Sequence, residues 1–200
     1  ALTVTNSYEK VLSLLNFMDD KISNNLTGFE LLWNDTYKQM VSDKTMYNKY
    51  LPDNSKYYVF IEFMGRDFEN DYNTFEKAVM EALDKGFVDD AVIGKNEKEQ
   101  LNIWGIREDV AVLAEEKKFD QQFDISIPVA QIGEVIDKTI NELKNCKGVE
   151  TIFPFGHVAD GNIHFIIGKN SDDDDLKSNI NEIIYSNTEL VKGSISAEHG

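Results

Sequence analysis

The segment spanning residues 155–165 constrains the fold more than any other part of the sequence, because it predicts a β-hairpin. It reads FGHVADGNIHF, and its Asp160-Gly161 pair stands between two runs that alternate in polarity. Asp-Gly in this position is typical of a two-residue turn that joins antiparallel strands. Such a turn places His157 directly opposite His164. The sequence therefore predicts an antiparallel sheet in which two histidines are cross-strand neighbours.

Strand-like and helix-like segments alternate along the rest of the chain. The strand-like runs cover residues 26–33, 57–64, 87–93, 122–127, 150–158 and 162–167. The segments with apolar residues at helical spacing cover residues 8–22, 35–47, 70–85, 96–117, 131–145 and 173–191. No segment reads as an interdomain linker, and no repeat with a short period is visible. The pattern predicts an α+β fold of the split βαβ type, with helices covering one face of the sheet.

The chain is strongly acidic and has enough apolar residues to bury a core. It carries 36 acidic and 20 basic residues, a formal net charge of −16, and 42% hydrophobic residues. This charge repels phosphate backbones and anionic membrane surfaces, so nucleic-acid binding through charge is excluded. The single cysteine, Cys146, cannot form an internal disulfide, which fits either a reducing compartment or a protein that is indifferent to redox conditions. Because the sequence starts at Ala1 without a targeting segment, we expect a piece of a longer protein.

The two hairpin histidines are a candidate metal site. The Cβ atoms of directly opposed residues lie roughly 4.5–5.5 Å apart, and two imidazoles can then share one ion at about 2.0–2.1 Å per bond. Asn162, two residues before His164, directs its amide to the same face, whereas Val158 and Ile163 can be buried on the other. The alternative is a pair of stacked or surface histidines without a ligand.

The remaining histidine lies in a motif at the end of the sequence, GSISAEHG over residues 193–200. Its small residues suit a backbone that passes close to a ligand. Glu198 would complete a His-His-carboxylate set of metal ligands, and His199 beside it would act as a general base. The alternative is an ordinary polar loop.

Arg107 is the third candidate, because arginine is scarce in this chain. Only two of the 20 basic residues are arginines, and Arg107 lies in a helix-like segment beside the apolar Ile103 and Ile106. A guanidinium matches a carboxylate with two parallel hydrogen bonds, which lysine cannot reproduce. Arg107 is therefore a candidate for binding a carboxylate ligand. The alternative is an ion pair with an acidic residue of the chain itself.

Taken together, these motifs resemble those of the FAD-linked oxidases of D-2-hydroxy acids, which include D-lactate and D-2-hydroxyglutarate dehydrogenases. This family belongs to the vanillyl-alcohol-oxidase type of flavoproteins. The resemblance is carried by the segments TGFELLW (27–33), WGIRED (104–109), FDISIP (123–128), GHVADGNIH (156–164) and SISAEHG (194–200). It implies that residues 1–200 form the C-terminal substrate domain, or cap domain, with a ferredoxin-like core. It also implies that the FAD-binding domain lies in a part of the protein absent from this sequence.

The resemblance also implies roles for the candidate residues. The matching positions are metal ligands at His157, His164 and Glu198, a substrate contact at Asn162, the base at His199, and the clamp on the substrate 1-carboxylate at Arg107. The metal in the family is Zn or Mn. The implied reaction transfers a hydride from the hydroxy acid to FAD and leaves a 2-oxo acid.

Two positions depart from the pattern of the hydroxyglutarate-specific members. Those members tend to have Thr four residues after the arginine and Lys just before the aromatic-Asp-x-Ser strand, where this chain has Ala111 and Gln122. The departure favours D-lactate, or a similar monocarboxylate, over a dicarboxylate. The resemblance further implies a mitochondrial location in a eukaryote and a cytoplasmic one in a bacterium. The implied partners are its own FAD-binding domain, an unidentified electron acceptor and, as one option, a second copy in a homodimer.

An alternative function from a different class is that of a non-enzymatic interaction module, which would retain the metal site and bind a partner. Some members of the family have been named actin-interacting proteins, and that label would then apply. Since the 200 residues contain no flavin-binding domain, we expect no turnover from the isolated fragment in either case.

Overall fold

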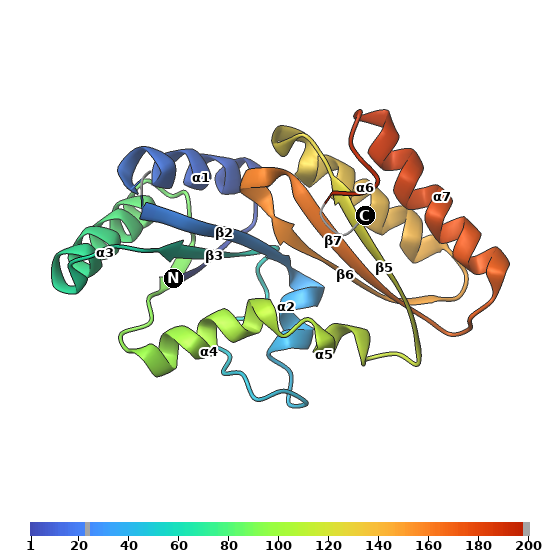
Figure 1. Ribbon diagram of the computed structural model, residues 1–200, viewed down its shortest axis with the longest axis horizontal. Coiled ribbons are helices and arrows are strands. Elements are labelled where there is room, and N and C mark those ends of the chain that lie inside the picture. The colour runs from blue at the N-terminus through green and yellow to red at the C-terminus, as the bar shows by residue number, and fades with distance from the viewer. Residues whose placement is uncertain (23–24, 198–200) are drawn as a thin grey trace. The chain divides into compact units, whose positions relative to one another are not determined.

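The computed structural model describes residues 1–22 and 25–197. They form two compact units, Ala1–Asp109 and Val110–Gly200. Each unit contains its own antiparallel strands and helices, so each is described by itself (Figure 1). Within the described ranges, no helix combines the length and apolar character needed to cross a membrane.

The first unit has the ferredoxin-like split βαβ topology. Its elements are β1 (Leu2–Thr5), α1 (Tyr8–Ile22), β2 (Leu26–Trp33), α2 (Asn34–Met40), β3 (Tyr57–Phe63), α3 (Phe68–Asp84), β4 (Asp90–Val92) and α4 (Glu97–Glu108). The strands lie in the order β4-β1-β3-β2, and neighbouring strands are antiparallel. The α+β class and the split βαβ arrangement predicted from the sequence are confirmed.

Helices cover both faces of the first unit's strands. On one face, α1 buries an apolar stripe that includes Val11, Leu14 and Met18. On the other face, Tyr37 of α2 stacks on Tyr58 of β3 with ring centroids 3.7 Å apart, and burial raises the pKa of Tyr37 to about 12. Figure 1 shows α1 and α4 on opposite sides of β2 and β3. The structure thus adds α2 and α4 as a second layer, and α4 carries Arg107.

From its first strand to its last helix, the second unit follows the strand and helix order of the first unit, with the 3₁₀ turn η3 in the place of α2. It contains α5 (Ala111–Ala114), β5 (Phe119–Ser126), a 3₁₀ turn η2 (Val129–Gln131), α6 (Ile132–Asn145), β6 (Val149–His157), a 3₁₀ turn η3 (Val158–Asp160), β7 (Asn162–Lys169) and α7 (Asp174–Leu190). The strand order is β6-β7-β5, again antiparallel. Phe123 of β5 packs edge-on against Tyr185 of α7, so the helices cover the face to which Phe123 points.

The two units repeat one βαββα plan, although no repeat is visible in the sequence. In the first unit β1 pairs with β3 on one side and with β4 on the other. In the second unit β5 pairs with β7 and, on its other side, Ser126 forms a bridge to Ser194 through reciprocal hydrogen bonds of 2.8 and 2.9 Å. Ser194 therefore occupies the position that corresponds to the fourth strand.

Two predicted helices differ from the structure, and one strand was not predicted. The helix predicted over 35–47 ends at Met40. The Thr45 hydroxyl donates to the Met40 carbonyl at 2.8 Å and so competes with the backbone N–H that this carbonyl would accept in a longer helix. The helix predicted over 96–117 is broken at Asp109, whose carboxylate accepts a hydrogen bond from Tyr47 at 2.9 Å. The strand β1 was not predicted, because four residues are too few for a period-two pattern to stand out.

Candidate functional site

The β6–β7 hairpin carries the predicted histidines, but its turn is longer than predicted. The chain makes the 3₁₀ turn η3 followed by Gly161 at φ 74°, so four residues connect the strands instead of two. His157 consequently pairs with Asn162, and His164 pairs with Phe155. The predicted pairing of His157 with His164 is wrong. The physical reason is that Val158 turns into the core and is fully buried, which the local Asp-Gly signal does not reveal.

The histidines nevertheless share one face, because the register differs from the prediction by two residues and side chains alternate with period two. The rings of His157 and His164 are diagonal neighbours with centroids 5.5 Å apart and nearly perpendicular planes. Asn162 lies in the same row as His157 and points to the same face. Ile163 is buried on the opposite face, as predicted. These polar residues thus lie on the face that α6 and α7 leave uncovered.

Asp124 joins this face from the neighbouring strand. It stands directly opposite His164 in the β5–β7 register, and its Oδ1 lies 3.3 Å from His164 Nδ1. A carboxylate this close to Nδ1 favours the tautomer with its proton on that nitrogen, in which Nε2 would be the ligand nitrogen. Sequence reasoning gave Asp124 no role. The available signal was a carboxylate alternating with buried Phe123 and Ile125 in a predicted strand.

The amide of Asn162 is the most unusual polar group of the site. Asn162 is only 3% exposed, and neither its oxygen nor its nitrogen has a hydrogen-bond partner among the described residues. A buried polar group without partners costs about 1–3 kcal/mol. A ligand with both a donor and an acceptor would satisfy this amide. The donor set on this face therefore fits a polar ligand held beside two imidazoles.

The described residues include two of the three predicted metal ligands, His157 and His164. Within residues 1–22 and 25–197, no three His, Cys, Asp or Glu side chains are grouped closely enough to hold an ion. The predicted third ligand, Glu198, and the predicted base, His199, both lie outside the described residues. The segment before them runs along β5, where Ala197 N–H donates to the carbonyl of Asp124 at 3.2 Å. The described residues thus supply two imidazoles, a ligand type that Zn and Mn both accept, but not a complete set of ligands.

Arg107 belongs to the first unit and is held in a buried ion pair. Its Nε and Nη2 both donate to Oε2 of Glu30 at 2.8 Å, and both side chains are 9% exposed. The ion pair was the alternative interpretation of Arg107. The sequence motifs gave Glu30 no role of its own, although a single charge in the apolar run FELLW was the available signal.

The two positions that favoured a monocarboxylate over a dicarboxylate substrate, Ala111 and Gln122, are both exposed. Ala111 begins α5, and the amide of Gln122 donates to Asp120 at 2.7 Å. Gln122 and Asp124 are two residues apart in β5, so they point to the same face.

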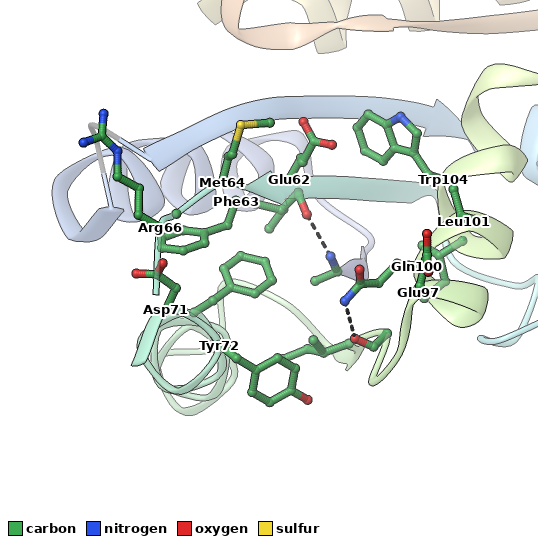
Figure 2. Close-up of a pocket in the computed structure, with 17 residues that line it drawn as sticks. Glu62, Phe63, Met64, Arg66, Asp71, Tyr72, Glu97, Gln100, Leu101 and Trp104 are labelled. Atoms are coloured by element: carbon green, nitrogen blue, oxygen red, sulfur yellow. Dashed lines mark hydrogen bonds between the residues drawn. The ribbon is translucent and has the colours of Figure 1, made fainter. Parts of the chain in front are cut away.

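A separate pocket of about 530 Å³ lies in the first unit (Figure 2). Its walls are mainly aromatic and aliphatic, with Phe63, Tyr72, Leu101 and Trp104 around it. The Trp104 indole packs close to Gly28 of β2 and donates to Glu108 at 2.8 Å. None of the predicted site residues within the described ranges lines this pocket.

Comparison with known proteins gives a match over the whole chain. The family model described as FAD linked oxidases, C-terminal domain, matches residues 1–200. The mitochondrial D-2-hydroxyglutarate dehydrogenase of Arabidopsis thaliana is 30% identical over 176 residues, which cover 88% of this chain and 31% of that protein. A mitochondrial protein of Schizosaccharomyces pombe, provisionally named D-lactate dehydrogenase, is 27% identical over 97% of this chain and 38% of its own length.

A bacterial relative and a solved structure extend these similarities. The D-2-hydroxyglutarate dehydrogenase of Stutzerimonas stutzeri is 26% identical over 98% of this chain and 42% of its own length. An alkyldihydroxyacetonephosphate synthase structure matches with a TM-score of 0.56 and 14% identity, covering 98% of this chain and 40% of that one. This structural likeness concerns the fold alone. The chain spans less than half the length of each of these proteins.

Proposed function

The chain belongs to the FAD-linked oxidase family as its C-terminal domain, and from this membership we propose that it is the substrate-binding part of a D-2-hydroxy acid dehydrogenase. In this proposal residues 1–200 are one functional domain of a longer flavoprotein whose FAD-binding domain is a separate part. The full-length protein oxidises the hydroxy acid to a 2-oxo acid. The observation that carries the proposal is the buried Asn162 amide, without partners among the described residues, beside His157 and His164.

The reaction removes two hydrogens from the substrate, and different groups accept them. The Cα hydrogen leaves as a hydride and the hydroxyl hydrogen as a proton. FAD, when bound, supplies the hydride acceptor. His199 takes the hydroxyl proton, and the Arg107 guanidinium binds the 1-carboxylate with two hydrogen bonds. The Asn162 amide, which can both donate and accept, contacts the substrate's oxygen atoms.

His157, His164 and Glu198 would hold a divalent metal, Zn or Mn, at the substrate hydroxyl. The chemistry that this ion supplies is polarisation of the hydroxyl, which lowers its pKa. Asp124 supports this role because its carboxylate lies at Nδ1 of His164 and orients the ring. Since the substrate is an anion and the chain is acidic, Arg107 and the metal provide the local positive charge.

We propose D-lactate, or a similar monocarboxylate, as the substrate. Ala111 cannot hydrogen-bond through its side chain, and Gln122 is neutral and already donates to Asp120. Neither offers the charge that a distal carboxylate of D-2-hydroxyglutarate would require. Relatives of this chain carry both names, so the family alone does not choose between them.

The proposed location follows from the names of the relatives. Several eukaryotic relatives are named mitochondrial, so we propose the mitochondrion if the source is a eukaryote and the cytoplasm if it is a bacterium. The proposed partners are the protein's own FAD-binding domain, an electron acceptor and, as one option, a second copy in a homodimer. The net charge of −16 argues against nucleic acid as a partner.

Substituting Asn162 tests the function through opposite effects on activity and stability. In the full-length protein, Asn162→Leu should lower kcat/KM for D-lactate by about 100-fold or more, because a donor and an acceptor for the substrate are lost. The thermal midpoint should stay equal or rise, because the unpartnered buried amide disappears. Steady-state kinetics and calorimetry measure the two quantities.

Asn187 offers a matched control for this experiment. It is equally buried, but its amide donates to Glu142 at 2.6 Å. Asn187→Leu should therefore lower the thermal midpoint and leave kcat/KM within about threefold. If Asn162→Leu behaves like Asn187→Leu, the amide is structural and the proposed substrate contact is wrong.

A further inference from the structure

The pocket of about 530 Å³ in the first unit lies in line with β1. In the β-ladder, Leu2 stands opposite Phe60 of β3 and opposite Val92 of β4. One residue earlier, the Ala1 nitrogen donates to the carbonyl of Ile61 at 2.7 Å, and the Ile61 N–H donates to the carbonyl of Ala1 at 2.9 Å. Ala1 thus continues the pairing of β1 with β3, and it also lines the pocket (Figure 2).

Two segments border the pocket beyond Ala1. The end of β3 lies on one side, and Ile93 and Gly94, which follow β4, lie on the other. In the antiparallel register of β1, the position directly before Ala1 falls opposite Glu62, and the position before that falls opposite Phe63. The pocket therefore occupies the course that β1 would follow if it were longer at its beginning.

The backbone of Phe63 directs its polar groups toward this course. Along a strand in an antiparallel sheet, successive residues direct their N–H and C=O to opposite edges. Ile61 bonds to Ala1 at the β1 edge, whereas the Met64 N–H donates to the carbonyl of Asn25 at 2.8 Å on the side of β2. Phe63, two residues after Ile61, hence directs its N–H and C=O to the β1 edge. Within the described ranges no residue of β1 stands opposite Phe63, and such an open edge is a template for another strand.

The polar groups around the pocket favour a strand over a small polar ligand. Several of the polar side chains that line it are already paired within the chain. Glu62 accepts a hydrogen bond from Thr27 at 2.8 Å, and the Gln100 amide donates to the carbonyl of Gly94 at 3.2 Å. A small-molecule site usually has polar side chains that converge on the ligand. Here the backbone of β3 offers the hydrogen bonds instead, and an added strand uses backbone groups of this kind.

The apolar residues of the pocket indicate that a chain segment covers them in the whole protein. Phe63 stacks on Phe75 of α3 with ring centroids 5.5 Å apart, and Figure 2 shows Leu101 on the side of α4. Leu101 and Met64 are 66% and 64% exposed, and apolar side chains that gather in one exposed place mark an interaction surface. Burial lowers the pKa of the Ala1 amino group to about 5, so this place suits the uncharged N–H of a peptide bond better than a charged amine.

We propose that the segment directly preceding Ala1 in the full-length protein extends β1 through this pocket and covers the open edge of β3. The residue two positions before Ala1 exchanges two hydrogen bonds with Phe63, and its side chain points toward Phe75, so it should be apolar. This inference rests on the part of the proposed function by which the chain is the C-terminal domain of a longer protein. The relatives leave room for such a segment, because this chain spans only 31%, 38% and 42% of the three described above.

Residue-resolved amide hydrogen exchange on the full-length protein tests the pairing without any variant. If β1 is extended, the protection of the Phe63 amide should lie within about tenfold of that of the Ile61 amide, which donates to Ala1. Arg66, in the exposed bend after β3, is the control and should be protected at least about 100-fold less. A Phe63 amide that is protected no more than that of Arg66 would overturn the proposal.

A pair of substitutions in the full-length protein asks separately whether the Phe63 N–H is bonded. Phe63→Ala removes the ring and its stacking on Phe75, and Phe63→Pro removes the N–H as well. Proline is tolerated in a strand where the N–H faces solvent, but not where the N–H is a donor in the ladder. We therefore expect the thermal midpoint of Phe63→Pro to lie about 3 °C or more below that of Phe63→Ala.

Ile61→Ala and Ile61→Pro are the matched controls, because the Ile61 N–H on the same edge of β3 is bonded to Ala1. Their midpoints should differ in the same direction. Equal midpoints for the two Phe63 variants, with different midpoints for the two Ile61 variants, would contradict the added strand.

These measurements do not involve substrate oxidation, so the two proposals can fail separately. If the full-length protein oxidises a D-2-hydroxy acid but its Phe63 amide is unprotected, the strand extension is wrong and the proposed function stands. If the protein oxidises no D-2-hydroxy acid but its Phe63 amide is protected, the proposed reaction is wrong and the strand extension stands.

Discussion

At the scale of single residues, carboxylates contact two of the side chains that the proposed function uses. Asp124 contacts His164 at 3.3 Å, and Glu30 contacts Arg107 at 2.8 Å. In both pairs a strand of one unit supplies the acid that orients a group assigned to the metal or the substrate. Such supporting contacts fix the direction of a ligand, and a site loses function when they are left loose.

Asp124→Asn should weaken metal binding without removing a ligand. The amide cannot hold the proton on Nδ1 of His164 as a carboxylate does, so the affinity for Zn or Mn should fall about 10–100-fold. Competition with a chromophoric chelator on the full-length protein measures the affinity. Asp120→Asn, four residues earlier in β5, is the control and should bind metal like the wild type. Equal affinities for all three proteins would show that Asp124 does not support a metal ligand.

The common face of His157, His164 and Asn162 was easier to predict from the sequence than the contacts of Asp124 and Glu30. His157, His164 and Asn162 stand close to a recognisable turn, so their common face could be predicted from period two alone. Asp124 and Glu30 act across strands or between a strand and a helix. Their partners depend on register and packing, which a single sequence does not specify.

At the scale of elements, the β6–β7 hairpin decides how the site is arranged. Its existence was predictable from Asp160-Gly161, but its length was not, because the burial of Val158 is a tertiary effect. Gly161 has φ 74°, and a Cβ there would lie 2.4 Å from the carbonyl oxygen of Ile127. Only glycine accommodates both the left-handed backbone and this close approach.

Gly161→Ala should therefore destabilise the protein by more than its backbone angle alone explains. Gly86 provides the comparison, since its φ is 70° and no atom lies within 4 Å of the position of a Cβ. We expect Gly86→Ala to lower the free energy of unfolding by about 1 kcal/mol and Gly161→Ala by roughly 3 kcal/mol. Urea denaturation followed by circular dichroism measures both. Equal losses would mean that the hairpin relaxes without contacting Ile127.

At the scale of the whole molecule, the chain consists of two units with one βαββα plan. The periodicity of single elements, such as α1, was sufficient to predict an α+β fold. The duplication was not predictable, because the plan is conserved in strand order while the side chains differ. Arg107 and the histidines lie in different units, and the last two predicted site residues lie outside the described ones.

The central claim is that the full-length protein oxidises a D-2-hydroxy acid, and anaerobic reduction of its flavin tests this most directly. D-lactate, L-lactate and D-2-hydroxyglutarate are mixed in turn with the oxidised enzyme while the absorbance of the oxidised flavin is followed by stopped flow. We expect rapid bleaching by D-lactate, slower bleaching by D-2-hydroxyglutarate and none by L-lactate. Faster reduction by D-2-hydroxyglutarate would contradict the substrate assignment, and a flavin that no D-2-hydroxy acid reduces would contradict the proposed function.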